Sequence, residues 1–309
     1  MIDNPMPPTA RFEQPASLSR VTDLLAAGGW SLLAGGTDVY PARVGRAMDG
    51  AWIDLTRVSG LRGITEDATG WTFGATTTWT DVLRAQLPPL FDALKQAARE
   101  VGGVQIQNTA TVAGNLCNAS PAADGTPVWM ALDAQVRLQS QAGERRMPVV
   151  DFVLANRRTA REPHEVVTGL HVPRRSPHAR SVFLKLGGRR YLVISVTMVA
   201  VVVDVDADVD ADGRADVDAA GRVTHLAAAV GSCSARAQRL PALEARLRGQ
   251  PLAVLAGTSI DPSDLAPLSP IADVRASAAY RLDATATLLR RALQTWTRVS
   301  PSPSARGLG

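Results

Sequence analysis

Residues 105–124 read QIQNTATVAGNLCNASPAAD and contain few bulky side chains. The stretch shows neither helical nor strand periodicity, and its glycine and alanines leave room for a flat ring or a pyrophosphate. Four of its side chains offer hydrogen bonds: Thr111, Asn115, Ser120 and Asp124. Long structureless runs inside compact domains are often functional, so this one predicts a ligand-binding loop. The alternative is an ordered, amide-rich turn within the core.

A second glycine-containing loop lies upstream, where residues 33–38 read LAGGTD after a short predicted strand. Paired glycines after a strand let the backbone approach a ligand and expose N–H groups to an anion. Thr37 adds a hydroxyl donor, and Asp38 can accept hydrogen bonds from a ribose or fix the loop. The spacing differs from the G-x-G-x-x-G dinucleotide fingerprint and no βαβ unit follows, so a plain turn is the alternative.

Composition limits the class of protein. A chain of 309 residues that is 46% hydrophobic suits one large domain or two ordinary ones. The formal charge of +4 is small, and the arginines are scattered rather than gathered into the basic stripe of a nucleic-acid surface. The longest apolar run, residues 191–203, is shorter than the ~20 residues of a membrane span, and residues 1–15 lack the features of a signal peptide.

Cysteine and histidine usage argues against a metal site in this chain. Cys117 and Cys233 are the only cysteines, too few for a disulfide framework or for an iron–sulfur cluster, and they indicate a reducing, cytoplasmic compartment. Both are expected to be small buried hydrophobes rather than redox thiols. The four histidines show no zinc-site spacing. Residues 204–218 are rich in aspartate and imitate the start of an EF-hand loop, but the required glutamate is missing, which favours a solvated hairpin extension.

Periodicity predicts a mixture of helices and strands. Helices are expected at residues 17–28, 81–101 with an interruption at two prolines, 126–132, the first part of 192–203, 241–247 and 276–296. Strands are expected at residues 30–33, 52–55, 71–75, 134–138, 166–172, 183–186, the last part of 192–203, and 223–230. A Pro-, Ser- and Arg-rich segment near residue 178 predicts a boundary between two domains, residues 1–178 and 179–299, followed by a disordered tail at 300–309.

Taken together, the two loops strongly resemble the FAD-binding subunits of the xanthine dehydrogenase, aldehyde oxidase and carbon monoxide dehydrogenase family. The resemblance covers nearly the whole chain and includes EPHEVVT at 162–168, FLKLGGRRY at 183–191 and PIADVRASAAYR at 270–281. It implies an α+β fold: a two-subdomain FAD-binding unit of the vanillyl-alcohol oxidase type, split near residue 60, and a smaller α+β C-terminal domain.

The resemblance also implies roles for individual residues. One side of the FAD, with its pyrophosphate and ribose, would be held by Leu33, Ala34, Gly35, Gly36, Thr37 and Asp38. The other side would be held by Thr111, Gly114, Asn115, Ser120 and Asp124. Ile106 would pack near the flavin edge, with Cys117 and Tyr191 also at the cofactor. Departures from the family pattern are Gln107, Ala113 and Val101, where many relatives show Arg, Gly and, in some, an aromatic residue.

Lys185 would lie by the pyrimidine end of the flavin. Reduced flavin carries negative charge there, and a fixed ammonium stabilises the reduced state. Lysine is rare in this chain, with only Lys95 and Lys185, which favours a specific role for a residual ammonium. The alternative is a side chain whose charged end reaches the surface.

The function implied is an electron-transfer subunit of a heteromeric molybdopterin-dependent hydroxylase. A molybdopterin-binding large subunit oxidises the substrate, a small subunit with 2Fe-2S clusters passes the electrons on, and FAD in this chain delivers them to NAD, oxygen or a quinone. No catalytic side chain is expected, because the flavin carries the chemistry. The alternatives are a stand-alone FAD oxidoreductase with its own substrate site and an assembly subunit that has lost FAD.

Overall fold

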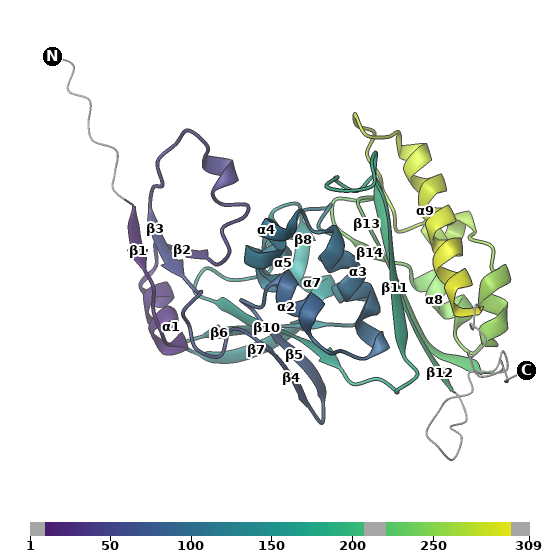
Figure 1. Cartoon of the computed structure of the whole chain (residues 1–309), viewed down its shortest axis with the longest axis horizontal. Coiled ribbons are helices and arrows are strands. Elements are labelled where there is room, and N and C mark those ends of the chain that lie inside the picture. The colour runs from purple at the N-terminus through teal and green to yellow at the C-terminus, as the bar shows by residue number, and fades with distance from the viewer. Residues whose placement is uncertain (1–9, 207–220, 298–309) are drawn as a thin grey trace, which may run out of the picture.

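The computed structural model describes residues 10–206 and 221–297 (Figure 1). The expected tail at 300–309 and residues 207–218 of the aspartate-rich segment lie outside these ranges. The strands are β1 Arg11–Glu13, β2 Trp30–Leu33, β3 Ala51–Asp54, β4 Ile64–Asp67, β5 Gly70–Gly74, β6 Gln135–Ser140, β7 Gly143–Pro148, β8 Val153–Ala155, β9 Arg158–Thr159, β10 Val166–Pro173, β11 Arg180–Leu186, β12 Thr197–Asp206, β13 Arg222–Gly231 and β14 Gln238–Arg239.

The α-helices are α1 Leu18–Ala27, α2 Trp79–Arg84, α3 Asp92–Glu100, α4 Val104–Thr109, α5 Val112–Asn118, α6 Gly125–Ala131, α7 Val149–Phe152, α8 Pro241–Leu247 and α9 Ala278–Gln294. Short 3₁₀ helices occur at Pro41–Arg43, Pro89–Phe91, Leu252–Gly257, Pro262–Leu265 and Thr295–Thr297. The expected mixture of helices and strands is confirmed.

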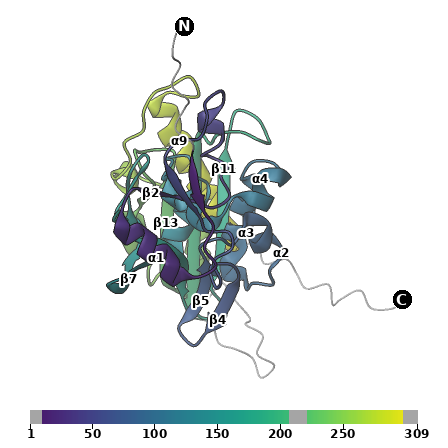
Figure 2. The same cartoon turned by 90° about the vertical axis from the view of Figure 1, so that its left-hand side faces the viewer.

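The N-terminal part is a small parallel sheet in the order β1-β3-β2 with α1 packed against it (Figure 2). The side chain of Ser17 caps α1 by accepting a hydrogen bond from the N–H of Arg20. Val21 and Leu25 of α1 pack with Ile53 of β3 in a separate small core. Because β2 and β3 are parallel, their carboxyl ends meet at one edge, and the chain leaves β2 there into the loop 34–38.

The central part is an antiparallel sheet in the order β4-β5-β10-β6-β7. Helices α2, α3 and α6 lie between this sheet and the four-stranded antiparallel sheet β11-β12-β13-β14 (Figure 1). One continuous core fills the space, and it includes Phe73 of β5, Trp129 of α6 and Met198 of β12. The two sheets therefore pack on opposite sides of one helical layer and share a single hydrophobic core with it.

The outer face of the second sheet is covered by α8 and α9, which form another core with Val199, Val201 and Leu289. Strand β12 is thus covered on both faces, and its residues are buried from Thr197 to Val205. The helix expected in the first part of residues 192–203 is wrong. A continuous run of β-branched residues is typical of a strand buried on both faces, and it carries no helical period.

The expectation that residues 105–124 lack regular structure is also wrong, because α4 and α5 occupy much of this stretch. The hydroxyl of Thr111 accepts a hydrogen bond from the N–H of Gly114 at 3.1 Å and caps α5. The left-handed conformation of Ala119, with φ 48°, ends the helix. Because its residues are small, this stretch has no apolar stripe from which a helix could be predicted. The same small residues let short helices pack closely against neighbouring backbone.

Half-buried charged side chains gather where the central helices meet the second sheet. Arg239 of β14 donates to Asp133 Oδ1 at 2.6 Å and to Glu244 Oε1 of α8 at 2.6 Å, and Arg175 also contacts Asp133. Nε2 of His225 lies 3.3 Å from Asp133 Oδ2 without forming a hydrogen bond. Burial, followed by the positive charge of Arg175, lowers the pKa of His225 below its ordinary value.

The aromatic centre of the shared core predicts a large loss of stability on truncation. The ring of Phe73 lies 5.3 Å from that of Phe91 and 5.1 Å from that of Trp129, and its side chain is inaccessible to solvent. We expect Phe73→Ala to lower the free energy of unfolding by about 3–5 kcal/mol. Urea and thermal unfolding would measure this, with the half-exposed Phe12→Ala as the matched control. Equal effects of the two variants would contradict the assignment of Phe73 to the core.

The pKa of His225 predicts a loss of stability in mild acid. The unfolded chain takes up this proton near the ordinary histidine pKa of about 6.5, whereas the folded protein resists it. The free energy of unfolding should therefore fall as the pH drops below about 6.5. We expect His225→Gln to show a smaller decrease between about pH 6.5 and 5 than the unsubstituted protein. The exposed His164→Gln serves as control, and an identical slope in His225→Gln and the unsubstituted protein would refute the prediction.

Candidate cofactor-binding site

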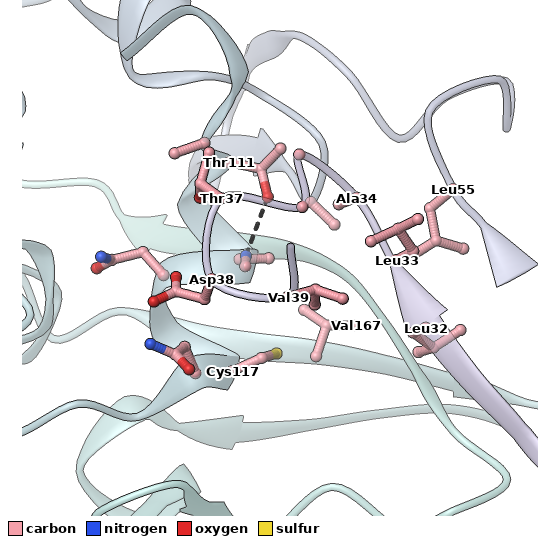
Figure 3. Close-up of a pocket in the computed structure, with 18 of the residues that line it drawn as sticks. Leu32, Leu33, Ala34, Thr37, Asp38, Val39, Leu55, Thr111, Cys117 and Val167 are labelled. Carbon is pink, nitrogen blue, oxygen red and sulfur yellow. Dashed lines mark hydrogen bonds between the residues drawn. The ribbon is translucent and has the colours of Figure 1, made fainter. Parts of the chain in front are cut away.

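A pocket of about 560 Å³ opens between the edge of the N-terminal sheet and helices α4 and α5 (Figure 3). The loop 34–38 supplies one wall, and the helices supply the opposite wall. The turn between β8 and β9 and the segment after it close a third side. The lining residues are Trp30, Ser31, Leu32, Leu33, Ala34, Gly35, Gly36, Thr37, Asp38, Val39, Leu55, Ala75, Thr76, Val101, Ile106, Ala110, Thr111, Ala113, Gly114, Asn115, Cys117, Asn118, Arg157, Thr159, Arg161 and Val167.

The two small-residue segments of the sequence meet in this pocket. A Cβ added to Gly35 would lie 1.9 Å from the carbonyl oxygen of Thr109 and 3.2 Å from the Cα of Ala110. Such contacts are possible only for a residue without a side chain. The expectation that residues 34–38 and the stretch around Thr111 lie together is confirmed. Gly36 has φ 69° and begins a turn in which the N–H of Tyr40 donates to its carbonyl oxygen at 3.0 Å.

The polar atoms of the pocket fit a phosphate-containing ligand. Within residues 10–206 and 221–297, the backbone N–H groups of residues 35–38 donate no hydrogen bond to a protein acceptor. The buried Oγ1 of Thr76 and Oδ1 of Asn115 also have no hydrogen-bond partner in this part of the chain. Buried polar atoms in native proteins almost always have a partner. The free N–H groups therefore point to a polar ligand between the two walls, as FAD would be.

The structure brings most of the expected site residues to this pocket. The following expected residues line it: Leu33, Ala34, Gly35, Gly36, Thr37, Asp38, Ile106, Thr111, Gly114, Asn115 and Cys117. Four expected residues do not: Ser120, Asp124, Lys185 and Tyr191. Tyr191 is 64% exposed, and the guanidinium of Arg190 lies over its ring.

Lys185 and Asp124 form a buried ion pair beside the site. Lys185 Nζ donates to Asp124 Oδ2 at 2.7 Å, and the hydroxyl of Ser195 donates to Oδ1 of the same carboxylate at 2.7 Å. Burial raises the pKa of Asp124, and the positive charge of Lys185 opposes that rise. The alternative of a surface lysine is wrong, because its side chain is only 7% exposed. The pair links the start of α6 to β11 in the second sheet.

Cys117 lines the pocket as an uncharged thiol. Burial raises its pKa to about 11, and the positive charge of Arg161 only partly opposes this. A thiol with a raised pKa forms little of the thiolate that redox reactions need. This agrees with the expectation that Cys117 packs as a small hydrophobe.

Several lining residues were not expected from the sequence. Thr76 follows β5 within a run of three threonines, and such a polar run at a strand end is the available signal for it. Arg157, Arg161 and Asn118 carry no local signal in the sequence. Leu55 and Val167 also line the pocket, but the sequence predicts them only as core residues. No local pattern distinguishes an apolar residue in a pocket wall from one in the packed interior.

The described residues contain no group of three or more side chains arranged as metal ligands. In the same residues, no helix is both long and apolar enough to cross a membrane.

A glycine-bearing loop with free N–H groups, set against short helices in a two-domain fold, defines a protein that binds a dinucleotide cofactor. Residues 8–175 match the family model of the FAD binding domain in molybdopterin dehydrogenase, and residues 183–296 match that of the CO dehydrogenase flavoprotein C-terminal domain. The chain belongs to this family of flavoprotein subunits.

Relatives of known name support this membership. The chain is 27% identical to the nicotine 6-hydroxylase medium subunit of Paenarthrobacter nicotinovorans over 93% of its own length and 96% of the relative's. It is 34% identical to the nicotinate dehydrogenase FAD-subunit of Eubacterium barkeri, over 54% of this chain and 58% of that protein. A solved structure of carbon monoxide dehydrogenase from Hydrogenophaga pseudoflava superposes with a TM-score of 0.79 at 26% identity, covering 93% of this chain and 97% of the matched chain.

The contact at Gly35 predicts a selective defect. Gly35→Ala would force its Cβ against the backbone of Thr109, which cannot rotate away as a side chain can. We expect the variant to lose bound flavin and to melt at a lower temperature, because the two walls must separate. The matched control is Gly257→Ala, since no atom lies within 4 Å of the added Cβ there. A Gly35→Ala protein that retains as much bound flavin as the unsubstituted protein would disprove the prediction.

Proposed function

We propose that this chain is the FAD-carrying electron-transfer subunit of a heteromeric molybdopterin-dependent hydroxylase. The observation that carries the proposal is the pocket between the loop 34–38 and helix α5, with its free N–H groups, in a chain of this family. FAD, when bound, supplies the means to accept electrons and to pass them to an external acceptor. The organic substrate is then oxidised on the molybdopterin-binding large subunit, and a small subunit carries the 2Fe-2S clusters.

The residues of the pocket have separate tasks in this proposal. The N–H groups of residues 35–38 hold the pyrophosphate, since oriented backbone donors favour a negative charge. Asp38 accepts from a ribose hydroxyl, and Thr76 and Asn115 line the wall that faces the cofactor. Ile106 and Val101 pack against the flavin ring. Apolar walls exclude water there and strengthen the electrostatic interactions around the cofactor.

Lys185 acts at the pyrimidine end of the flavin in this proposal, although it does not line the pocket. Its ammonium is held by Asp124, so the pair presents little net charge and raises the redox potential of the flavin less than a lone lysine would. Ser120, Asp124 and Tyr191, which the resemblance assigned to the cofactor, then support the site from outside its lining.

The proposed domain division follows the family pattern. The FAD-binding unit spans residues 1–178, with two subdomains of the vanillyl-alcohol oxidase type split near residue 60, and the C-terminal domain spans 179–299. The separate core of α1 and β3 supports the first split. Two unpaired cysteines agree with a cytoplasmic location. The electron acceptor is proposed to be NAD, oxygen or a quinone.

Purification of the chain from cells that express its partner subunits tests the proposal. We expect a yellow complex of three subunits with one FAD per copy of this chain, whose flavin is bleached when substrate is added anaerobically. A yellow protein that oxidises a substrate without partners would favour a stand-alone oxidoreductase. A colourless protein, with partners or without, would instead favour an assembly subunit, and either result would refute the proposal.

A further inference from the structure

Two arginines make one wall of the pocket cationic, one in the turn between β8 and β9 and one just after β9. Neither was among the residues expected at the site. The residues that line the whole pocket include two arginines, Arg157 and Arg161, and one acid, Asp38. A dinucleotide carries a pyrophosphate with two negative charges, so an excess of positive charge in the wall complements it. Both arginines therefore stand where charge is useful for ligand binding, but their hydrogen bonds differ.

The guanidinium of Arg161 is used by the protein itself. Its NH1 nitrogen donates to the carbonyl oxygens of Glu165 at 2.7 Å and Glu162 at 2.9 Å. These bonds fix the segment that leads into β10, which carries Val167 into the pocket wall. Arg161 thus contributes charge to the pocket but serves first as a structural support.

The protein holds Arg157 in place, but in the described part of the chain most of its guanidinium N–H donors have no protein acceptor. Its N–H donates to the carbonyl oxygen of Ala119 at 3.0 Å, and its NH1 nitrogen donates to Asn118 Oδ1 at 2.9 Å. Both bonds tie it to the end of α5. A guanidinium has five N–H donors, and in the described part of the chain only one of them has a protein acceptor. The side chain is exposed and still lines the pocket.

The backbone at Arg157 adds a second sign of constraint. Its φ of 55° lies in the left-handed region, which non-glycine residues seldom adopt. A conformation of this kind persists where the surrounding structure fixes it, and such residues cluster at binding sites. The two bonds to the end of α5 provide that fixation, and they set the guanidinium against the pocket.

The position of Arg157 along α5 indicates which half of the cofactor it meets. The helix begins beside the loop 34–38, where the free N–H groups lie, and it ends at Asn118, about 10 Å away for seven residues. Val101 and Ile106, the apolar residues suited to the flavin ring, come before the start of the helix in the chain. The flavin is assigned to these apolar residues, and the nucleoside to the end of α5 at Asn118.

We infer that Arg157, positioned by Asn118, binds the adenosine monophosphate half of FAD and makes the pocket select FAD over FMN. The inference rests on the proposed function, because it assumes that the pocket holds a flavin. A phosphate oxygen, a ribose hydroxyl and the ring nitrogens of adenine are all acceptors, and a guanidinium fork donates to such groups without rearrangement. FMN lacks the adenosine monophosphate half, so it has nothing for Arg157 to bind.

Arg157→Gly tests this with little disturbance of the fold, since glycine adopts a φ of 55° more readily than arginine. The matched control is Arg158→Ala, which removes the adjacent arginine at the start of β9, a residue that does not line the pocket. The purified complex is stripped of flavin and titrated with FAD and, separately, with FMN, following flavin fluorescence. Melting temperatures of the flavin-free proteins report on folding independently.

For Arg157→Gly we expect FAD affinity to fall about tenfold or more, which corresponds to at least one charge-assisted hydrogen bond, and FMN affinity to stay unchanged. Arg158→Ala should bind both flavins as the unsubstituted protein does. Unchanged FAD affinity in Arg157→Gly, or an equal loss for FAD and FMN, would overturn the inference while leaving the proposed function intact. If the unsubstituted protein binds neither flavin, that result would refute both the proposed function and the inference.

Discussion

The contact of Gly35 with the backbone of Thr109 and Ala110 is the constraint on which the site depends. It brings the carboxyl edge of the small parallel sheet directly against the junction of α4 and α5. A side chain at position 35 would hold the two walls apart, so glycine is required by space rather than by backbone conformation. With the walls this close, the N–H groups of residues 35–38, which have no acceptor in the described part of the chain, face a pocket that is narrow enough to surround a ligand.

A shared helical layer gives this pocket a rigid base. Helix α6 contacts β12 and β13 of the second sheet and places Trp129 against Phe73 of the central sheet, and the same core runs from Phe73 to Met198. Two ion pairs cross this junction, the buried pair of Lys185 with Asp124 and the half-buried pair of Arg239 with Asp133. A buried charge that loses its partner is costly, because the low-dielectric interior offers no water in exchange. Separation of the domains would leave Lys185 and Asp124 unpaired, so the two domains support each other.

The arrangement suits a subunit that holds a cofactor and supplies no reactive side chain of its own. The pocket is lined by hydroxyls, an amide pair, two arginines and apolar residues, and its thiol is kept uncharged by burial. These groups can bind, orient and shield a flavin. The flavin then carries the electrons, and the protein sets how strongly it is held and which end faces which wall.

The sequence by itself determined the two cofactor loops, the pairing of a flavin-binding unit with a C-terminal domain, and most strands and helices. These properties are local: paired glycines after a strand, strand alternation, and helical spacing in α1, α8 and α9 each depend on residues near in the chain. Residues 34–38 and Thr111 could be assigned because small and polar residues at a loop are unusual without a ligand.

Only the tertiary structure decided the rest. Helices α4 and α5 have no apolar stripe in the sequence, and they form because Thr111 caps α5 and because close packing against Gly35 compensates for their small side chains. The strand β12 was mistaken for a partial helix, since burial on both faces removes the alternation that identifies a strand. Arg157 reaches the pocket from a turn 39 residues beyond its partner Asn118, and no local pattern records a contact across that separation.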